Sequence, residues 1–270
     1  MGLTNRVVPC IDVDIDDDGS AAVYTGVQFE DLAYTGDPVE MARAYNESGA
    51  DELVFLDITA SAEGRETMLD VVERVADEVF IPLTVGGGIR SVEDIKETLR
   101  AGADKVSINT AAIDRPALIT EGAKAFGSQC IVVAVDAKRR HDDRGTNYVD
   151  VNGESVWFEA MVAGGREGTG IDVLEWVEEA EKRGAGEIFV NSIDRDGTKE
   201  GYDLALMEAV ADRVSLPIIA SSGAGSPEHM REAYAAGADA ALAASIFHFG
   251  EYTIEETKAA LADAGVPIRR

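Results

Sequence analysis

Four aspartates are candidates for proton-transfer chemistry. Asp12 lies near the end of one apolar run, and Asp136 ends another. If these runs are opposing strands of one barrel, the two carboxyl groups face each other across its mouth, where confinement can keep one protonated and the other ionised. This favours a general acid and base, although each aspartate could instead only cap the segment that follows. Asp194 and Asp196, in SIDRDGT, are weaker candidates, because Asp-Gly-Thr is also ordinary turn chemistry.

Two glycine-rich segments have the composition of phosphate-binding loops. VGGGIRS spans 85–91 and ASSGAGS spans 220–226, and each is followed along the chain by a second candidate, NTA at 109–111 and AAS at 243–245. Glycines let backbone N–H groups approach an anion, and a helix start adds further donors. A single such loop is often only a tight turn. The paired occurrence predicts a substrate with a phosphate at each end.

Four charged residues stand at the beginnings of apolar runs, where solvent-facing charge is the ordinary interpretation. They are Arg6, Glu52, Lys105 and Glu187. If they point inward, they form a neutral ring that closes the end of the barrel opposite the aspartates. The composition alone favours charges that face solvent at this end of the barrel, the end that usually serves stability.

Eight short apolar runs alternate with helical patterns along the whole chain. Most are apolar throughout, as expected of parallel strands covered on both faces. Candidate helices begin at Ser91 and Ser226, which can cap the first amides. The eight runs are Arg6 to Val13, Glu52 to Ile58, Ile81 to Val85, Lys105 to Ile108, Ile131 to Asp136, Glu187 to Ile193, Leu216 to Ala220 and Ala240 to Ala244.

An internal repeat defines the architecture. When residues 81–110 are aligned with 216–245, an offset of 135, nine of the thirty positions are identical, and the same offset relates 49–59 to 184–194. Two (βα)₄ halves that cannot close a sheet alone predict an α/β fold, a (β/α)₈ TIM barrel. We expect one barrel domain over 1–270, with half-barrels about 1–125 and 126–270.

The charge balance excludes several classes of protein. Asp and Glu number 51 against 24 Lys and Arg, a net charge of −27, while 46% of residues are hydrophobic. Such a chain folds around a core but is unsuited to anionic nucleic acid or membrane surfaces. The acidity favours a high-salt cytoplasm over an ordinary acidic protein, because salt screens the repulsion. Cys10 and Cys130 lie in apolar runs without metal-ligand spacing, which predicts reduced core thiols and no metal site.

Several strings resemble one known family. DELVFLDITAS, TVGGGIR, GADKVSINTAA, FGSQCIVVAVDAK, NSIDRDGTK, GADAALAASIFHF and the terminal GVPIR are similar to the cyclase subunits of imidazole glycerol phosphate synthase, a histidine biosynthesis barrel family. The resemblance runs from Arg6 to the C-terminus. It implies that ammonia converts phosphoribulosyl-formimino-aminoimidazole carboxamide ribotide (PRFAR) into imidazole glycerol phosphate and an aminoimidazole carboxamide ribotide (AICAR), without a cofactor.

The resemblance also implies roles for individual residues. Asp12 and Asp136 match the family's catalytic pair. The four strand-start charges match a gate at the floor of an ammonia tunnel, against which a glutaminase subunit docks at the N-terminal face. Substrate and phosphate contacts are implied for Gly87, Gly88, Asn109, Thr110, Asn191, Asp196, Gly197, Ser222, Gly223, Ala244 and Ser245.

One departure from the family concerns the first loop, which usually carries a lysine over the substrate. Here Thr25 stands at that place and the stretch Val13 to Val27 holds no basic residue. The insertion after the fifth run, with Lys138, Arg139 and Arg140, is a candidate source of the missing charge. Two alternatives stay open: the related isomerase of the same pathway, also a duplicated barrel, and a non-catalytic barrel that binds phosphorylated metabolites and scaffolds a partner.

Overall fold

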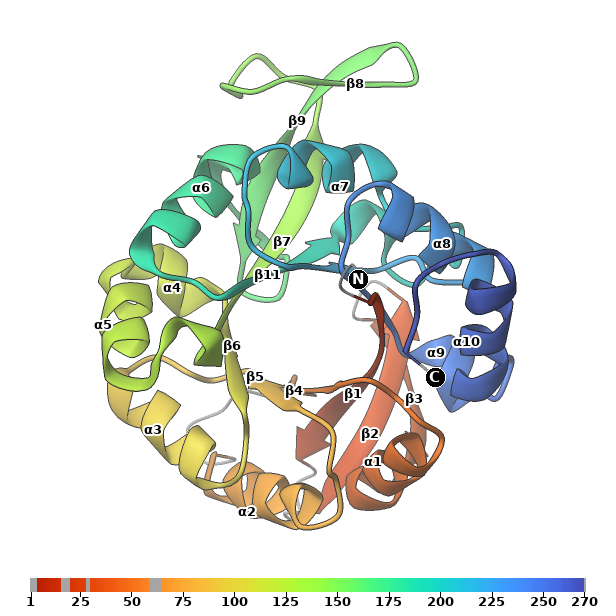
Figure 1. Cartoon of the computed structure of the whole chain (residues 1–270). Coiled ribbons are helices and arrows are strands. Elements are labelled where there is room, and N and C mark those ends of the chain that lie inside the picture. The colour runs from red at the N-terminus through yellow and green to blue at the C-terminus, as the bar shows by residue number, and fades with distance from the viewer. Residues whose placement is uncertain (1–3, 16–19, 28–29, 59–64, 270) are drawn as a thin grey trace.

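A closed ring of eight parallel strands forms the centre of the molecule (Figure 1). This computed structural model describes residues 4–15, 20–27, 30–58 and 65–269. Pairing of β6 with β7 closes the ring, which confirms the predicted barrel. In barrel order the strands are β1 (Arg6–Ile15), β4 (Leu53–Asp57), β5 (Leu83–Gly86), β6 (Lys105–Ile108), β7 (Ile131–Arg140), β11 (Glu187–Ser192), β12 (Ile218–Ser221) and β13 (Ala240–Ala243).

Helices surround the ring on its outer side, and several begin at capping residues anticipated from the sequence. The side chains of Ser91 and Ser226 accept hydrogen bonds from the backbone N–H of the third residue of α3 and of α8. The helices are α1 (Pro38–Glu47), α2 (Arg65–Ala76), α3 (Val92–Arg100), α4 (Thr110–Asp114), α5 (Ala117–Phe126), α6 (Val173–Arg183), α7 (Leu204–Ala211), α8 (Pro227–Ala235), α9 (Ser245–His248) and α10 (Ile254–Asp263), with short 3₁₀ turns η1 (Ser128–Cys130) and η2 (Ile193–Arg195).

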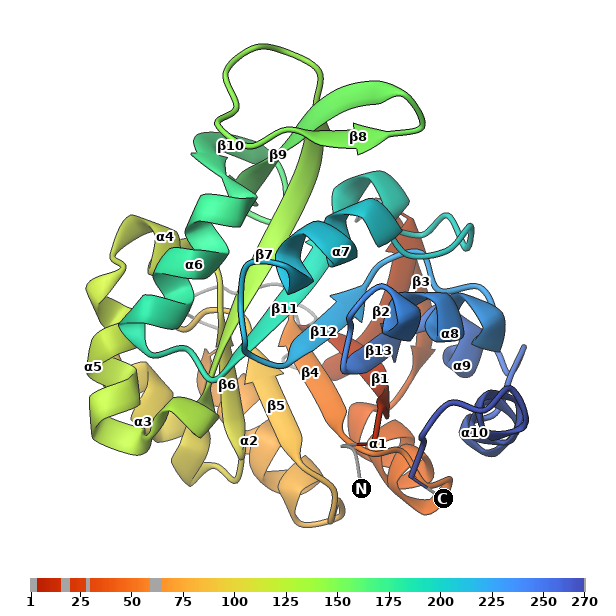
Figure 2. The same cartoon turned by 45° about the horizontal axis from the view of Figure 1, so that its top comes forward.

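Two antiparallel additions extend the barrel beyond the predicted strands. β1 continues into a hairpin of β2 (Ala21–Val27) and β3 (Glu30–Gly36). β7 continues past Asp136 and pairs with β9 (Glu154–Val162), which in turn pairs with β8 (Val149–Val151) and β10 (Glu167–Asp172). This second addition projects from one side of the barrel (Figure 2). The insertion after the fifth predicted strand is therefore largely a sheet.

The barrel wall separates two apolar clusters. The larger one lies between strands and helices, because parallel strands covered on both faces bury alternate residues on each side. The smaller one fills the barrel interior with Val8, Val54, Val132, Phe189 and Ile219 among others, all nearly inaccessible. The interior is thus an apolar column between the two ends of the barrel. The prediction of two core thiols holds for Cys10 only, since Cys130 ends η1 and is half-buried.

Repeat-related residues make the same local contacts in both halves. The side chain of Asp104 accepts a hydrogen bond from the N–H of Leu83 at 2.9 Å, and that of Asp239 accepts one from Ile218 at 3.0 Å. The offset of 135 relates Asp104 to Asp239 and Leu83 to Ile218. The common Gly-Ala-Asp segment therefore fixes the start of a neighbouring strand in the same way twice.

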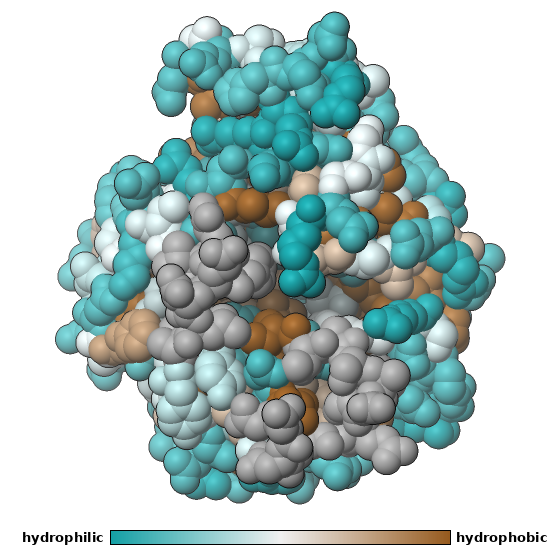
Figure 3. All heavy atoms as spheres, turned by 180° about the vertical axis from the view of Figure 1, so that it is seen from behind, coloured by the Kyte–Doolittle hydropathy of each residue, from teal (hydrophilic) through white to brown (hydrophobic). Residues whose placement is uncertain are grey.

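Figure 3, seen from the side opposite to Figure 1, shows mainly hydrophilic atoms at the periphery and hydrophobic atoms near the centre. Among the described residues, no helix is long and apolar enough to span a lipid bilayer.

Candidate active site at the carboxyl ends of the strands

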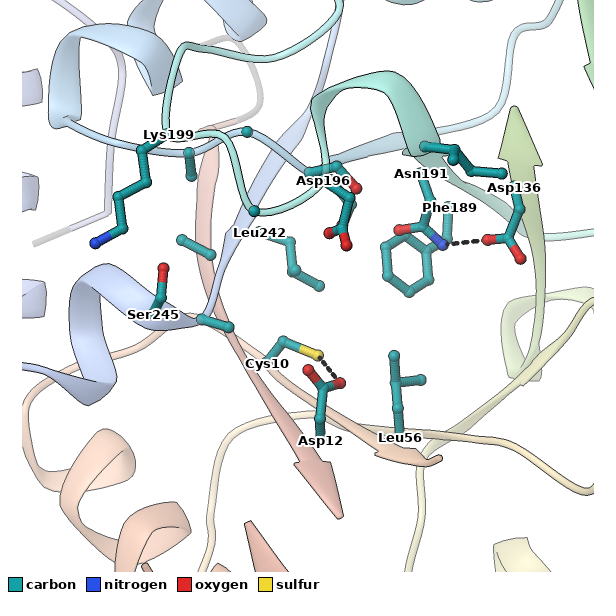
Figure 4. Close-up of a pocket in the computed structure, with 18 residues that line it drawn as sticks. Cys10, Asp12, Leu56, Asp136, Phe189, Asn191, Asp196, Lys199, Leu242 and Ser245 are labelled. Carbon is teal, nitrogen blue, oxygen red and sulfur yellow. Dashed lines mark hydrogen bonds between the residues drawn. The ribbon is translucent and has the colours of Figure 1, made fainter. Parts of the chain in front are cut away.

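A pocket at the mouth of the barrel collects most of the predicted site residues (Figure 4). It lies where the strands end, the place at which barrels of this kind carry their active sites. Leu56 and Phe189 supply apolar wall. The predicted residues that line it are Asp12, Asp136, Asn191, Asp196, Gly197, Ser222, Gly223, Ala244 and Ser245.

Asp12 lies on β1 within a mostly apolar part of this pocket. The thiol of Cys10 donates to its Oδ1 at 3.5 Å. Burial raises the pKa of Asp12 to about 6; the Cys10 hydrogen bond opposes this shift, and the negative charge of Asp196 adds to it. The carboxyl group can therefore hold or release a proton near neutral pH.

Asp136 lies on β7, across the barrel from β1, and is buried. The amide Nδ2 of Asn109 donates to its Oδ2, and that of Asn191 to its Oδ1, both at 2.9 Å. Burial raises the pKa of Asp136 to about 6, while the two amides lower it and Asp196 raises it further. The two amide hydrogen bonds therefore hold this carboxyl group in a single orientation.

The two aspartates of the SIDRDGT segment have different surroundings. Asp196 is half-buried and directs its carboxyl group into the pocket, above Asp12 in the close-up view (Figure 4). Asp194 is exposed and accepts a hydrogen bond from the backbone N–H of Arg139 at 2.8 Å. Asp196 thus remains a candidate for substrate contact, whereas Asp194 anchors the extended part of β7.

The two predicted phosphate loops have matching backbone conformations. Gly87 and Gly88 have φ of +95° and +65°, and their repeat partners Ser222 and Gly223 have φ of +72° and +93°. Two successive residues with positive φ are rare outside glycine, so Ser222 is an outlier that the loop retains. A Cβ on Gly87 would lie 2.3 Å from the carbonyl oxygen of Asp57, so the loop packs directly on the end of β4.

The second elements of the two sites also correspond. Asn109 and Ala244 precede short helices with φ, ψ of −123°, −93° and −119°, −78°. Ser245 lines the pocket, whereas the hydroxyl of Thr110 accepts from the N–H of Ala163 in the insertion at 3.2 Å. The structure gathers the second set around the pocket. Of the first set, Asn109 reaches it through its bond with Asp136.

Four charged side chains form a closed ring at the other end of the barrel. Arg6 donates to Glu52 and Glu187 at 2.7 and 2.5 Å, and Lys105 donates to the same carboxylates at 2.6 and 2.8 Å. The hydroxyl of Thr84 adds a hydrogen bond to Glu52 at 2.8 Å. Each carboxylate contacts both cations, so the ring is neutral. The four side chains therefore point inward and pair with one another, so the expectation of solvent-facing charges was wrong.

The ring keeps its charges because they are paired. Burial by itself would raise the pKa of Glu52, but Lys105 and Arg6 together hold it below its usual value. Removing one member would leave the other three with a net charge at a largely buried site, and breaking a buried pair in this way typically costs about 3–5 kcal/mol. The four charges therefore depend on one another, and they lie together below the apolar column.

The three basic residues of the insertion are not equivalent. Arg139 pairs with Asp203 at 2.7 Å and Arg140 pairs with Glu159 at 2.5 Å, and both carboxylates are buried. These arginines are committed to holding the insertion in place. Lys138 stays a candidate for the missing charge.

Thr25, which occupies the place of the family's first-loop lysine, lies in β2. Its side chain is outside the described part of the structure, as are residues 16–19 of the same stretch.

Three residues near these sites were not anticipated as functional. Lys199 lines the pocket, the Cys10 thiol contacts Asp12, and Thr84 contacts the ring. Register offers a signal for the last two, because Cys10 and Asp12 point to one face of β1 and Thr84 stands beside Lys105 across paired strands. Lys199 stands in a turn segment and carries no comparable signal.

Comparison with known proteins places the chain in a family. A family model described as histidine biosynthesis protein matches residues 6–253. The chain belongs to the histidine biosynthesis protein family. Two relatives named imidazole glycerol phosphate synthase subunit HisF are each 73% identical: that of Halobacterium salinarum covers 100% of this chain and 98% of its own length, and that of Haloarcula marismortui covers 100% of both.

More distant members of the histidine biosynthesis family carry the same name. The subunit from Methanocaldococcus jannaschii is 56% identical over 99% of both chains. These full-length matches confirm the resemblance to the cyclase subunits and favour it over the isomerase. The halophilic archaea among the relatives agree with the prediction of adaptation to high salt, because screening reduces repulsion within an acidic surface.

Proposed function

We propose that this chain is the cyclase subunit of imidazole glycerol phosphate synthase and converts PRFAR and ammonia into imidazole glycerol phosphate and AICAR. The observation that carries the proposal is the pair Asp12 and Asp136, on opposed strands of one pocket, each with a pKa of about 6. Full-length identity to named synthase subunits supports the same activity.

The two aspartates suit the proton transfers that the reaction requires. Ammonia adds to the ribulosyl carbonyl carbon, whose oxygen must gain protons and leave as water. Closure of the imidazole ring then accompanies cleavage of a C–N bond, which releases AICAR. Near neutral pH one carboxyl group can donate a proton while the other accepts one. We assign these roles to the pair jointly, since their environments give similar pKa values.

The phosphate groups of PRFAR fit the two loop pairs. We assign one phosphate to Gly87, Gly88, Asn109 and Thr110, and the other to Gly197, Ser222, Gly223, Ala244 and Ser245, with Asn191 and Asp196 nearer the middle of the substrate. Support comes from the matching positive φ values, which allow backbone N–H groups to converge on an anion. Backbone donors contribute to the binding of a doubly phosphorylated substrate without changing the formal charge of an acidic chain.

Ammonia would reach the aspartates through the barrel. The apolar interior that includes Val8, Val54 and Phe189 admits neutral ammonia more readily than ammonium, because a bare cation is costly to desolvate. The ring of Arg6, Glu52, Lys105 and Glu187 stands at the entrance. We propose that it acts as the gate.

We place the docking site of a glutaminase subunit at the N-terminal face, around this ring. Phe80, in the connection between α2 and β5 at that face, is 87% exposed. A large exposed aromatic side chain is typical of a protein interface. Phe80→Asp should weaken the complex with the glutaminase while ammonia-dependent turnover by the isolated chain stays unchanged. We place this heterodimer in the cytoplasm, in keeping with two free thiols.

The activity is tested with purified chain, PRFAR and an ammonium salt at alkaline pH, by following loss of PRFAR absorbance. The expected result is ammonia-dependent conversion to both products. Absence of that conversion in a folded sample would contradict the proposal. Adding the cognate glutaminase with glutamine then tests the partner. A Lys105→Met variant tests the gate, and it should lower glutamine-dependent turnover more than ammonia-dependent turnover.

A further inference from the structure

Lys199 is a basic residue in a pocket lined by carboxylates. Of the described residues that line the pocket, Lys199 is the one cation, whereas Asp12, Asp136 and Asp196 are potential anions. Its side chain extends along the rim on the side of Ser245 (Figure 4). A dianionic phosphate bound beside these carboxylates requires positive charge, and backbone dipoles supply only partial charges.

The backbone of Lys199 is held in an uncommon conformation. Its φ of +57° lies in the left-handed region that side-chain-bearing residues seldom adopt. The segment packs against the second phosphate loop: the N–H of Gly201 donates to the carbonyl of Gly223 at 2.8 Å, and a Cβ on Gly225 would lie 2.2 Å from the carbonyl oxygen of Lys199. The two loops thus pack as one unit, and this packing fixes the position of the Lys199 backbone.

The ammonium group has an exchangeable partner. Lys199 pairs with Glu251, which follows α9, and the two side chains are 39% and 40% exposed. Ion pairs this exposed contribute little to stability, so releasing the carboxylate costs little. A phosphate carries more negative charge than a carboxylate and accepts several charge-assisted hydrogen bonds.

We propose that Lys199 binds the phosphate group at the second site, formed by Ser222, Gly223, Ala244 and Ser245, and that the phosphate displaces Glu251. The inference rests on the proposed function. At the repeat-related position the sequence has Gly64. The sequence repeat therefore provides no second lysine at the position that corresponds to Lys199.

The test is Lys199→Met, which keeps the length of the side chain and removes its charge. We expect KM for PRFAR to rise about 10- to 100-fold, the usual effect of losing a charged hydrogen bond, with kcat nearly unchanged. Each product carries a single phosphate. The inhibition constant of one product should therefore rise by the same factor, while that of the other should not change.

Three variants control the interpretation. Lys199→Arg keeps the charge and should largely restore KM. Glu251→Gln removes the competing carboxylate and should lower KM by up to about fivefold. Lys182→Met on α6 removes an exposed lysine that also pairs with a glutamate, and should leave KM unchanged.

Equal weakening of both products, or an unchanged KM in a folded Lys199→Met variant, would overturn the assignment. The melting temperature of each variant checks its folding. If the unmodified chain fails to convert PRFAR, the proposed function fails instead, and binding of each product separately still tests the lysine.

Discussion

The two aspartates at the mouth occupy related positions but have different neighbours. In the strand register, Asp136 stands beside Asn191 of the next strand, and Asp12 stands beside Leu56. Asn109, which donates to Asp136, directly follows β6, the strand before β7 in the barrel. The corresponding residue after β13, the strand before β1, is Ala244, which has no side-chain donor. Asp136 therefore receives two amide hydrogen bonds, and Asp12 receives one from a thiol.

Despite these different neighbours, the two aspartates have similar acidity. Both carboxyl groups have a pKa of about 6, because burial dominates at each. At the other end of the barrel, the floor ring of Arg6, Glu52, Lys105 and Glu187 also has buried carboxylates. The pKa of Glu52 is nevertheless lowered, because two cations contact it. A buried carboxylate stays charged where cations meet it, and it can exchange a proton where only neutral groups do.

The largest expected effect comes from removing either carboxylate. Asp12→Asn and Asp136→Asn should each lower kcat by about 10²–10⁴-fold, the usual contribution of a general acid or base. The affinity for each product should change little, because the phosphate loops are intact. Steady-state turnover and isothermal calorimetry measure the two quantities. A variant that retains turnover would remove its aspartate from the mechanism and leave the other as the sole proton carrier.

A second effect concerns stability. The pKa of Asp12 is raised in the folded chain from its usual 3.8 to about 6, so the unfolded chain releases this proton first as pH rises. The free energy of unfolding therefore falls as pH rises from about 3.8 to about 6. Above about pH 6 the folded chain bears the full free-energy cost of holding a buried, ionised Asp12. Asp12→Asn should raise the free energy of unfolding by about 1–3 kcal/mol at pH 8 and by almost nothing at pH 4. Thermal melts at both pH values test this.

Asp136→Asn is the matched comparison for that measurement. An asparagine places one N–H₂ group opposite the amide of Asn109 or Asn191, and so loses a hydrogen bond. Its gain in stability at pH 8 should therefore be smaller. Equal gains would mean that the amides do not distinguish the two sites.

Exchanging the neighbours should exchange the behaviour. Asn191→Leu removes a donor from Asp136 and should raise its pKa, whereas Leu56→Asn adds a donor beside Asp12 and should lower its pKa. Each shift should be about one pH unit, because one hydrogen bond contributes about 1 kcal/mol. The pH dependence of kcat/KM reports them. Shifts in the same direction for both variants would show a change in the whole pocket.

The smallest effect is expected at Cys10. The Cys10→Ala variant loses the thiol that donates to Asp12 and should raise the pKa of that aspartate by less than about one pH unit. The limb of the kcat/KM profile that Asp12 controls should move to higher pH accordingly. Cys130 is half-buried and contacts a backbone carbonyl instead, so Cys130→Ala serves as the control.

Much of the barrel could be predicted because its signal is local. Apolar, β-branched runs bounded by Gly or Pro give the eight barrel strands to within a few residues, except that β7 continues to Arg140. The offset of 135 indicates the pairing of the halves. The hairpin of β2 and β3 was missed, since its acidic and small residues do not alternate as strands usually do.

The site was only partly predictable for a related reason. Strand ends identify Asp12 and Asp136, but their pKa values depend on neighbours from other strands, such as Leu56 and Asn191. The insertion after Asp136 reads as a charged loop, because Arg139 and Arg140 find their buried carboxylates only in the folded chain. Long-range ion pairs leave no periodic signal in the sequence.

The floor ring has a consequence for how the barrel is assembled. Both of its cations, Arg6 and Lys105, come from the first proposed half, whereas each half supplies one carboxylate, Glu52 or Glu187. Two first halves would bring together twice as many cations as carboxylates, and two second halves would bring carboxylates without cations. The ring thus selects unlike halves as partners, a discrimination that their similar backbones do not provide.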